Sequence, residues 1–104
     1  MSKVYVYTRN SNVEAFEKGS SRETQIKKCG SYASIKDLVI DEIVQEQCSG
    51  QLPFDRRDKA FELLKKLKSN DHIICSHLDR FCRNTLSLLQ MIQKFKKKKI
   101  YLHF

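Results

Sequence analysis

Two strand-like segments that lie far apart in the chain each run directly into arginine. Residues 4–11 read VYVYTRNS, and residues 71–83 read DHIICSHLDRFCR. Their β-branched and aromatic residues are typical of strands. If the two strands are parallel neighbours, the hydroxyl of Ser11 and three guanidiniums gather at their carboxyl ends, where open α/β sheets bind ligands. Guanidiniums are planar forks suited to phosphate oxygens, so the inferred chemistry is attack by a serine on a phosphodiester.

Strand patterns alternate with helix patterns along the whole chain. The expected strands cover residues 3–8, 38–44 (interrupted by Asp41 and Glu42), 72–76 and 100–104, and the expected helices follow N-caps at Ser21, Asp55 and Asn84 and reach about Ala33, Lys68 and Lys99. This alternation implies βαβ crossovers. We therefore expect an α/β fold, a mainly parallel sheet of about four to five strands with helices on both faces. With 104 residues and no internal repeat, one domain is expected.

The charge balance favours a polyanionic partner. The formal net charge is +8 and the pI is near 9.5, which fits nucleic acid but also fits a merely soluble surface. A membrane partner is not expected, because no apolar run approaches the ~20 residues of a spanning helix and no signal peptide precedes the first strand. On these grounds a cytoplasmic location is expected.

A lysine cluster, Lys94 with Lys96, Lys97, Lys98 and Lys99, closes the last expected helix. Such lysines suit sequence-independent binding of DNA through counterion release. A lysine run at a helix end is nonetheless usually solvated surface, which here is also favourable at the negative pole of the helix dipole. Both interpretations stay open.

The four cysteines do not form a metal-binding framework in the sequence. Cys29, Cys48, Cys75 and Cys82 include no C-x-x-C pair and are expected to be reduced thiols. A zinc site built from His72, Cys75, His77 and Cys82 is disfavoured, because alternation along a strand turns His72 away from Cys75 and His77. Neither a metal nor another cofactor is therefore expected.

Taken together, the motifs resemble a known family. Tyr7-x-Arg9-x-Ser11 with Leu78-Asp79-Arg80-x-x-Arg83-Asn84 resembles the catalytic domain of serine recombinases, the resolvase/invertase family. Three further features follow the family's order: Gln25 on the first helix, Ser49-Gly50 after the second strand, and Arg57 ahead of an apolar helix bearing Ala60, Leu63 and Leu64. Arg56 competes with Arg57 for the loop position, and the spacing to the helix favours Arg57. Asn10 departs from the family, which usually has an aliphatic residue there.

The resemblance implies an enzymatic role for each of these residues. Ser11 would attack a DNA phosphate and form a 5′-phosphoserine link, so that strands are religated to new partners without ATP. Arg9, Arg57, Arg80 and Arg83 would stabilise the transition state in place of a metal ion. Asp79 would orient an arginine or move a proton, and its alternative role is a structural salt bridge. Gln25 would steady the nucleophile segment or contact phosphate, and its alternative is a polar position on a helix surface.

The resemblance also implies a resolvase-like three-layer sandwich and a wider assembly. Residues 1–104 would form the catalytic domain without the family's long dimerisation helix and C-terminal DNA-binding part. The expected partners are DNA and further recombinase subunits, as a dimer and as a tetramer in the synaptic complex. The expected function is site-specific DNA recombination in a prokaryotic cell or the host of a mobile element. The alternative is a catalytically silent module that associates with full-length recombinase subunits.

Overall fold

The computed structural model describes residues 2–10, 22–48, 52–76 and 85–104. Within them the strands are β1 (Val4–Asn10), β2 (Glu42–Gln47), β3 (His72–Cys75) and β4 (Tyr101–His103). The helices are α2 (Arg22–Ile35), α3 (Asp58–Lys66) and α5 (Thr85–Lys98), with a short 3₁₀ turn η1 at Phe54–Arg56. None of the helices in these ranges is long and apolar enough to cross a membrane.

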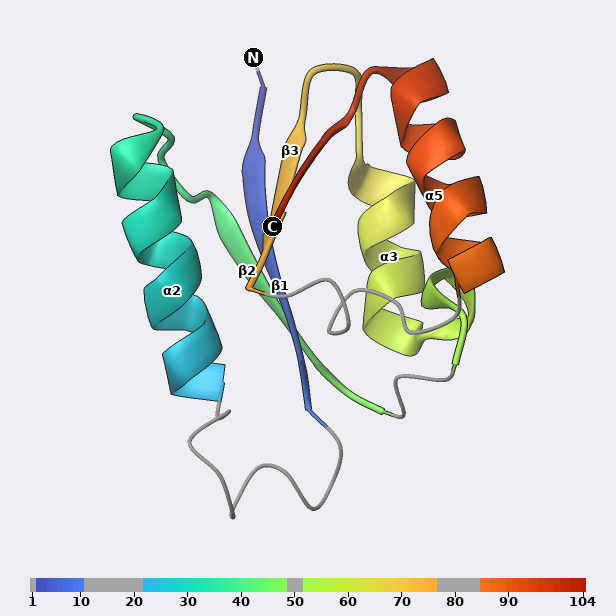
Figure 1. Ribbon diagram of the computed structural model, residues 1–104, viewed down its shortest axis with the longest axis horizontal. Coiled ribbons are helices and arrows are strands. Elements are labelled where there is room, and N and C mark those ends of the chain that lie inside the picture. The colour runs from blue at the N-terminus through green and yellow to red at the C-terminus, as the bar shows by residue number, and fades with distance from the viewer. Residues whose placement is uncertain (1, 11–21, 49–51, 77–84) are drawn as a thin grey trace.

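The four strands form one parallel sheet in the order β2-β1-β3-β4. Val6 of β1 lies opposite Ile43 of β2 on one side and Ile74 of β3 on the other. Helix α2 covers one face of the sheet, while α3 and α5 cover the other (Figure 1). The predicted three-layer α/β fold with a parallel sheet is therefore confirmed.

Burial along β1 explains why this strand is central. All seven residues of β1 are buried, as expected for a parallel strand covered on both faces. Val4 and Val6 face α2 and pack with Cys29 of that helix. Tyr5 and Tyr7 belong to the larger core on the opposite face, whose other buried members include Phe54, Leu63, Ile73, Met91, Phe95 and Ile100.

The second strand begins later than the sequence suggests. Residues 38–40 were expected to be extended, but they form no strand, and β2 starts at Glu42. Leu38 instead closes α2, because its N–H bonds to the carbonyl of Ala33 at 2.8 Å and Asp37 takes a left-handed φ of 57°, as in a Schellman cap. The prediction that Asp41 and Glu42 interrupt a strand was therefore wrong.

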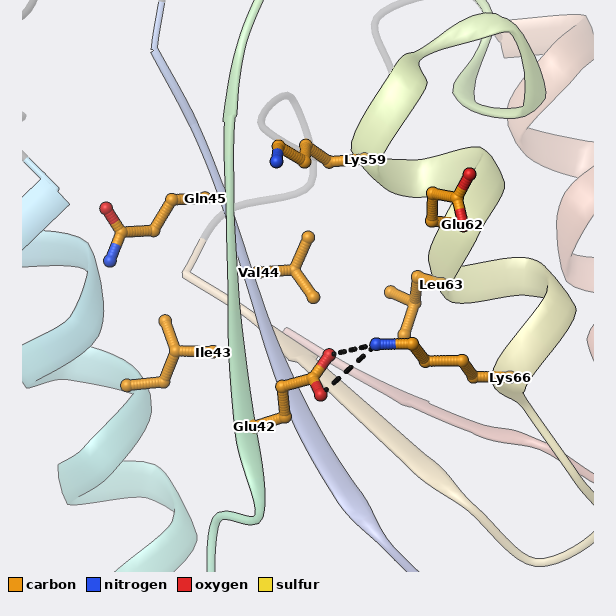
Figure 2. Close-up of a pocket in the computed structure, with 8 residues that line it drawn as sticks. All are labelled: Glu42, Ile43, Val44, Gln45, Lys59, Glu62, Leu63 and Lys66. Atoms are coloured by element: carbon orange, nitrogen blue, oxygen red, sulfur yellow. Dashed lines mark hydrogen bonds and ion pairs between the residues drawn. The ribbon is translucent and has the colours of Figure 1, made fainter.

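Along β2 the side chains alternate between the two faces. Glu42 and Val44 project toward α3, and Ile43 and Gln45 project to the other side (Figure 2). β2 is an edge strand of the described sheet, and its Ile43 is 39% exposed. The next residue on the α3 side is Glu46, which is buried.

The start of α3 also differs from the prediction. Asp55 was expected to cap this helix, but it lies in η1, and α3 begins at Asp58 after Arg57. The cap comes from another strand: Glu46 accepts the N–H groups of Lys59 at 3.0 Å and Ala60 at 2.8 Å. A carboxylate at this position also complements the positive end of the helix dipole. The helix ends at Lys66, two residues before the expected Lys68.

α5 ends at Lys98, close to the predicted end of the last helix, and its Met91 and Phe95 are buried as expected. The predicted N-caps Ser21 and Asn84 lie outside the described residues.

Candidate active site at the carboxyl ends of the strands

Arg9 lies near the carboxyl end of β1 and is almost fully buried, with 1% of its surface exposed. Its Nη1 donates to the backbone carbonyl of Cys48, just beyond the end of β2, at 2.9 Å. Arg9 has the same side-chain parity as Tyr5 and Tyr7, so it projects toward the α3 face. The predicted position of this arginine at a strand's carboxyl end is confirmed.

Gln25 holds the backbone of the same strand end. Its Oε1 accepts the N–H of Arg9 at 3.1 Å, and its Nε2 donates to the carbonyl of Arg9 at 3.2 Å and to Oδ1 of Asn10 at 3.1 Å. Only 3% of Gln25 is exposed, so the alternative of a polar helix-surface position is wrong. The amide fixes the last two residues of β1, and Ser11 is the next residue in the chain.

Arg57 reaches the same face of the sheet from the loop before α3. It is fully buried, and its Nε donates to the carbonyl of Leu52 at 3.0 Å while its Nη1 donates to the hydroxyl of Tyr7 at 3.1 Å. The guanidinium carbon lies 5.7 Å from the ring centroid of Phe54 and 6.0 Å from that of Tyr7, within cation–π range. Arg56 is exposed, so the buried member of the pair is the one that the spacing favours.

Tyr7 and Glu46 connect Arg57 to the sheet. The Tyr7 hydroxyl accepts from Arg57 and donates to Oε1 of Glu46 at 3.3 Å. Burial raises the pKa of Tyr7 well above its ordinary value, although the positive charge of Arg57 acts in the opposite direction. The hydroxyl therefore stays protonated at neutral pH and can serve as donor and acceptor at once.

Glu46 is a site residue that was not predicted from the sequence. Glu46 is 4% exposed and accepts three hydrogen bonds, from Tyr7, Lys59 and Ala60. A signal was available: Glu46 shares the inward parity of Val44 on β2, and a charged residue at an inward position needs a partner.

The guanidiniums of Arg9 and Arg57 both affect the pKa of the Cys48 thiol. Burial raises the pKa of Cys48, while Arg57 and, to a lesser extent, Arg9 lower it. Arg9 donates to the carbonyl of Cys48, and Arg57 reaches Glu46 of β2 through the hydroxyl of Tyr7, so both buried cations lie beside the end of β2. Fixed guanidiniums in such a region interact with phosphate oxygens more strongly than they would in water.

Several predicted site residues lie outside the described residues. These are Ser11, Asp79, Arg80 and Arg83, together with Ser49, Gly50, His77 and Cys82. β1 and β3 are parallel neighbours, as the argument for a shared site requires. The chain leaves β1 for Ser11 and leaves β3 for residues 77–84.

The predicted lysine patch is not part of this arrangement. Lys94 and Lys96–Lys98 belong to the C-terminal half of α5, and Lys99 follows it. That end of α5 lies at the opposite end of the molecule from the carboxyl ends of β1 and β2 (Figure 1).

Metal-ligating side chains do not cluster in the described ranges. There, no group of three or more histidine, cysteine or acidic side chains is arranged to hold a metal ion. His72, considered above as a ligand, bonds through Nδ1 to Nε2 of His103 at 2.9 Å. The other ring nitrogen of His103 lies 2.8 Å from the hydroxyl of Tyr32.

Comparison with known proteins agrees with this geometry. Residues 4–104 match the family described as "Resolvase, N terminal domain". The Transposon Tn2501 resolvase of Escherichia coli is 24% identical over 103 residues, which is 99% of this chain but 50% of that resolvase, so the chain spans about half the length of this curated relative.

Solved structures show the same fold. The N-terminal catalytic domain of TP901-1 integrase is similar with a TM-score of 0.85 and 27% identity, over 96% of this chain and 75% of that one. The C-terminal catalytic domain of ISC1926 TnpA, an IS607-like serine recombinase, is similar with a TM-score of 0.75 and 19% identity, over 96% of this chain and 65% of that one. Because the family match covers nearly the whole sequence, this chain belongs to the resolvase N-terminal domain family.

Proposed function

We propose that this chain is the catalytic domain of a site-specific DNA recombinase that cuts and rejoins DNA through a phosphoserine intermediate. The observation that carries the proposal is the convergence of Arg9, Arg57 and Gln25 at the carboxyl end of β1, directly before Ser11 in the chain. Two buried cations beside a strand end that the chain leaves for Ser11 form a suitable environment for a phosphodiester.

In the proposed reaction, the hydroxyl of Ser11 gives up its proton to a base or to solvent, and its Oγ attacks the phosphorus of a DNA phosphodiester. The bond between phosphorus and the 3′ oxygen breaks, and the DNA strand leaves with a free 3′ hydroxyl after that oxygen gains a proton. The 5′ phosphate stays on Ser11. Because one phosphodiester is exchanged for another, the reverse attack by a different 3′ hydroxyl rejoins the strands without a nucleotide cofactor.

The arginines have complementary parts in this scheme. Arg9 and Arg57, with Arg80 and Arg83, would neutralise the charge that gathers on the phosphate oxygens in the transition state. Loss of one such donor typically lowers the rate by about 10²–10³-fold. Asp79 would orient an arginine or carry the proton of the leaving oxygen. Gln25 acts through the backbone of Arg9 and is a positioning residue.

Strand exchange needs more than one cut, so the proposed partners are DNA and further recombinase subunits. A dimer bound at one site and a tetramer joining two sites are the expected assemblies. The proposal needs no metal ion, since the guanidiniums supply the positive charge that Mg²⁺ supplies in many nucleases.

The test is detection of the covalent intermediate. The polypeptide is incubated with a random-sequence DNA library, quenched with detergent and trimmed with nuclease, and the peptide carrying Ser11 is weighed by mass spectrometry. We expect an added nucleotide on this peptide with or without EDTA, and its loss in Ser11→Ala. Ser20→Ala, which removes another serine from the sequence between β1 and α2, is the matched control and should retain the adduct.

Each outcome of this test has a meaning. An adduct that persists in Ser11→Ala rejects the nucleophile, and an adduct that requires divalent metal rejects the metal-free mechanism. A complete absence of adduct rejects catalysis by this polypeptide and favours the silent module. In that case, adding the chain to another recombinase should inhibit or restore the recombination activity of that protein, because either effect requires the two chains to associate.

A further inference from the structure

Eight exposed lysines gather at the end of the molecule that faces away from Arg9 and Arg57. They come from the start of β1, from the end of α3 and the turn after it, and from the end of α5: Lys3, Lys65, Lys66, Lys68, Lys96, Lys97, Lys98 and Lys99. In Figure 1 this end is at the top, where β1 begins and both helices finish. We call it the lysine pole.

A turn that ends in the buried Asp71 holds three of these lysines together. The carboxylate of Asp71 accepts the N–H of Lys3 at 2.9 Å through Oδ1 and the N–H of Lys68 at 2.9 Å through Oδ2. The N–H of Asn70 donates to the carbonyl of Lys99 at 2.7 Å. Asp71 itself is only 3% exposed. Three segments distant in sequence are thereby fixed side by side, with their lysine side chains outside.

One of the three lysines occupies a strained backbone position. Lys99 has a φ of 62°, its N–H bonds to the carbonyl of Lys96, and the N–H of Ile100 bonds to that of Phe95. This is a Schellman cap, whose left-handed residue is usually glycine. A lysine there accepts backbone strain. Side-chain packing does not account for a lysine in place of glycine at this position, because the Lys99 side chain is exposed.

The carboxylates at this pole do little to neutralise the ammonium groups. Asp71 is buried against backbone N–H groups, and Asp41 accepts the N–H of Val4 at 2.8 Å. Glu42 pairs with Nζ of Lys66 at 3.1 Å (Figure 2). Among the described residues, this is the ion pair that a lysine of the pole forms.

The helix dipole accounts for only part of the cluster. Lysines in the last turns of α3 and α5 complement the negative helix ends. Lys3 precedes β1, Lys68 lies in the turn after α3, and Lys99 lies beyond α5. A hollow of about 420 Å³ opens between the first two of these segments and is lined by Lys3, Lys65, Lys66 and Lys68, together with Tyr5, Glu42 and Asp71.

We propose that the lysine pole binds the sugar–phosphate backbone of duplex DNA, as a contact separate from the candidate active site. Ammonium groups are compact point charges that bind phosphates without reading sequence. Arg9 follows Lys3 by six positions of extended chain, which at about 3.3 Å per residue is about 20 Å. DNA at the pole is therefore a different stretch from DNA at the carboxyl end of β1. The identity of the polyanion rests on the proposed function.

The first experiment compares two variants that lose the same charge. Lys68→Gln/Lys97→Gln removes two lysines of the pole, and Lys27→Gln/Lys28→Gln removes two exposed lysines of α2. Binding of a fluorescent random-sequence duplex is followed by anisotropy over a range of salt concentration. Each phosphate contact adds about 0.9 to the slope of log affinity against log salt, so the pole variant should bind about 60-fold more weakly at about 0.1 M salt, with a slope lower by about 1.8. The α2 variant should keep the wild-type slope. Equal losses in both variants would overturn the proposal, because they would reflect net charge alone.

The second experiment separates the effect of the Lys99 charge on DNA binding from the effect of its backbone conformation on stability. Lys99→Gly removes the left-handed strain, so the melting temperature should not fall. DNA affinity should nevertheless drop about eightfold at about 0.1 M salt. An unchanged affinity with a retained melting temperature would show that the position is purely structural and would overturn the proposal.

Two further outcomes distinguish this inference from its alternatives. If the pole variants lose self-association in sedimentation equilibrium but keep the DNA affinity, the surface belongs to a second copy of the chain, and the proposal fails. If the Ser11 adduct is absent while the pole variants still weaken DNA binding, the recombinase function fails and the DNA contact stands.

Discussion

Replacing Glu46 with glutamine keeps the size of the side chain but removes one charge and one acceptor oxygen. The carboxylate accepts the N–H of Lys59 through Oε2 at 3.0 Å, and the N–H of Ala60 at 2.8 Å and the hydroxyl of Tyr7 at 3.3 Å through Oε1. A glutamine offers one carbonyl oxygen and an NH₂ group. The NH₂ group must then take the place of Oε2, where it faces the N–H of Lys59, or of Oε1, where it faces the N–H of Ala60 and the hydroxyl of Tyr7.

The loss of unfolding free energy expected for Glu46→Gln follows from these three contacts. Loss of one hydrogen bond to a charged, buried acceptor costs about 1.5–3 kcal/mol. Loss of the negative charge at the start of α3 costs about 0.3–1 kcal/mol more. The two effects act on the same helix end, so the free energy of unfolding should fall by about 2–4 kcal/mol. That is a large fraction of the stability of a domain of this size.

Urea unfolding followed by far-UV circular dichroism measures this change. Glu62→Gln is the matched control, because Glu62 lies on the same helix and is exposed, and its free energy of unfolding should change by less than about 0.5 kcal/mol. A Glu46→Gln variant within the range of this control would refute the view that Glu46 holds the start of α3. If the slope of unfolding free energy against urea concentration changes in only one variant, its unfolded state is altered, and the two variants are then compared by thermal unfolding.

Two further predictions concern Arg57 and Cys29. Arg57→Lys should lower the free energy of unfolding by about 1–3 kcal/mol, because one ammonium group cannot replace the planar donors that reach Leu52 and Tyr7. Arg56→Lys, at the exposed neighbouring position, should leave the free energy of unfolding unchanged. Equal losses in the two variants, measured by urea unfolding, would contradict this prediction. Burial raises the pKa of Cys29 from 9.0 to about 11, so the folded state holds the thiol proton more tightly than the unfolded state does. The contribution of this proton to the free energy of unfolding is complete below pH 9.0 and is lost as the pH rises toward about 11. Cys29→Ala should flatten the decline in unfolding free energy across that window, and an unchanged decline would refute the assignment.

Much of the fold follows from local patterns in the sequence. The parallel sheet and its two helical layers could be predicted because strand and helix periods alternate cleanly and the central strand is apolar on both faces. The starts of β2 and α3 could not. Leu38 closes α2 rather than starting a strand, and α3 is capped by Glu46 from another strand rather than by the local Asp55. The first outcome reflects a local Schellman cap whose left-handed residue is Asp37 and not the usual glycine, and the second depends on a tertiary contact that outweighs local propensity.

The candidate site divides in the same way. Arg9 and Arg57 could be predicted from motif spacing, and the structure buries both beside the end of β2. The buried position of Gln25 could not be read from a helix with little amphipathic pattern, because its partner is the backbone of a strand that lies beside it only in three dimensions. Spacing in a sequence reports which residues share a face, whereas hydrogen bonds to a neighbouring backbone leave no periodic trace.

The contact between Gln25 and Arg9 has a consequence for how this protein tolerates change in length. One amide side chain joins the last residues of β1 to the first turns of α2, so the stretch between them is tethered at both ends. Lengthening a tethered stretch is inexpensive, since doubling a loop costs only about 0.6 kcal/mol of closure entropy. Insertions or grafted sequences between Ser11 and Ser21 should therefore leave the sheet register intact, and this segment is the natural place to engineer new sequence beside the proposed nucleophile.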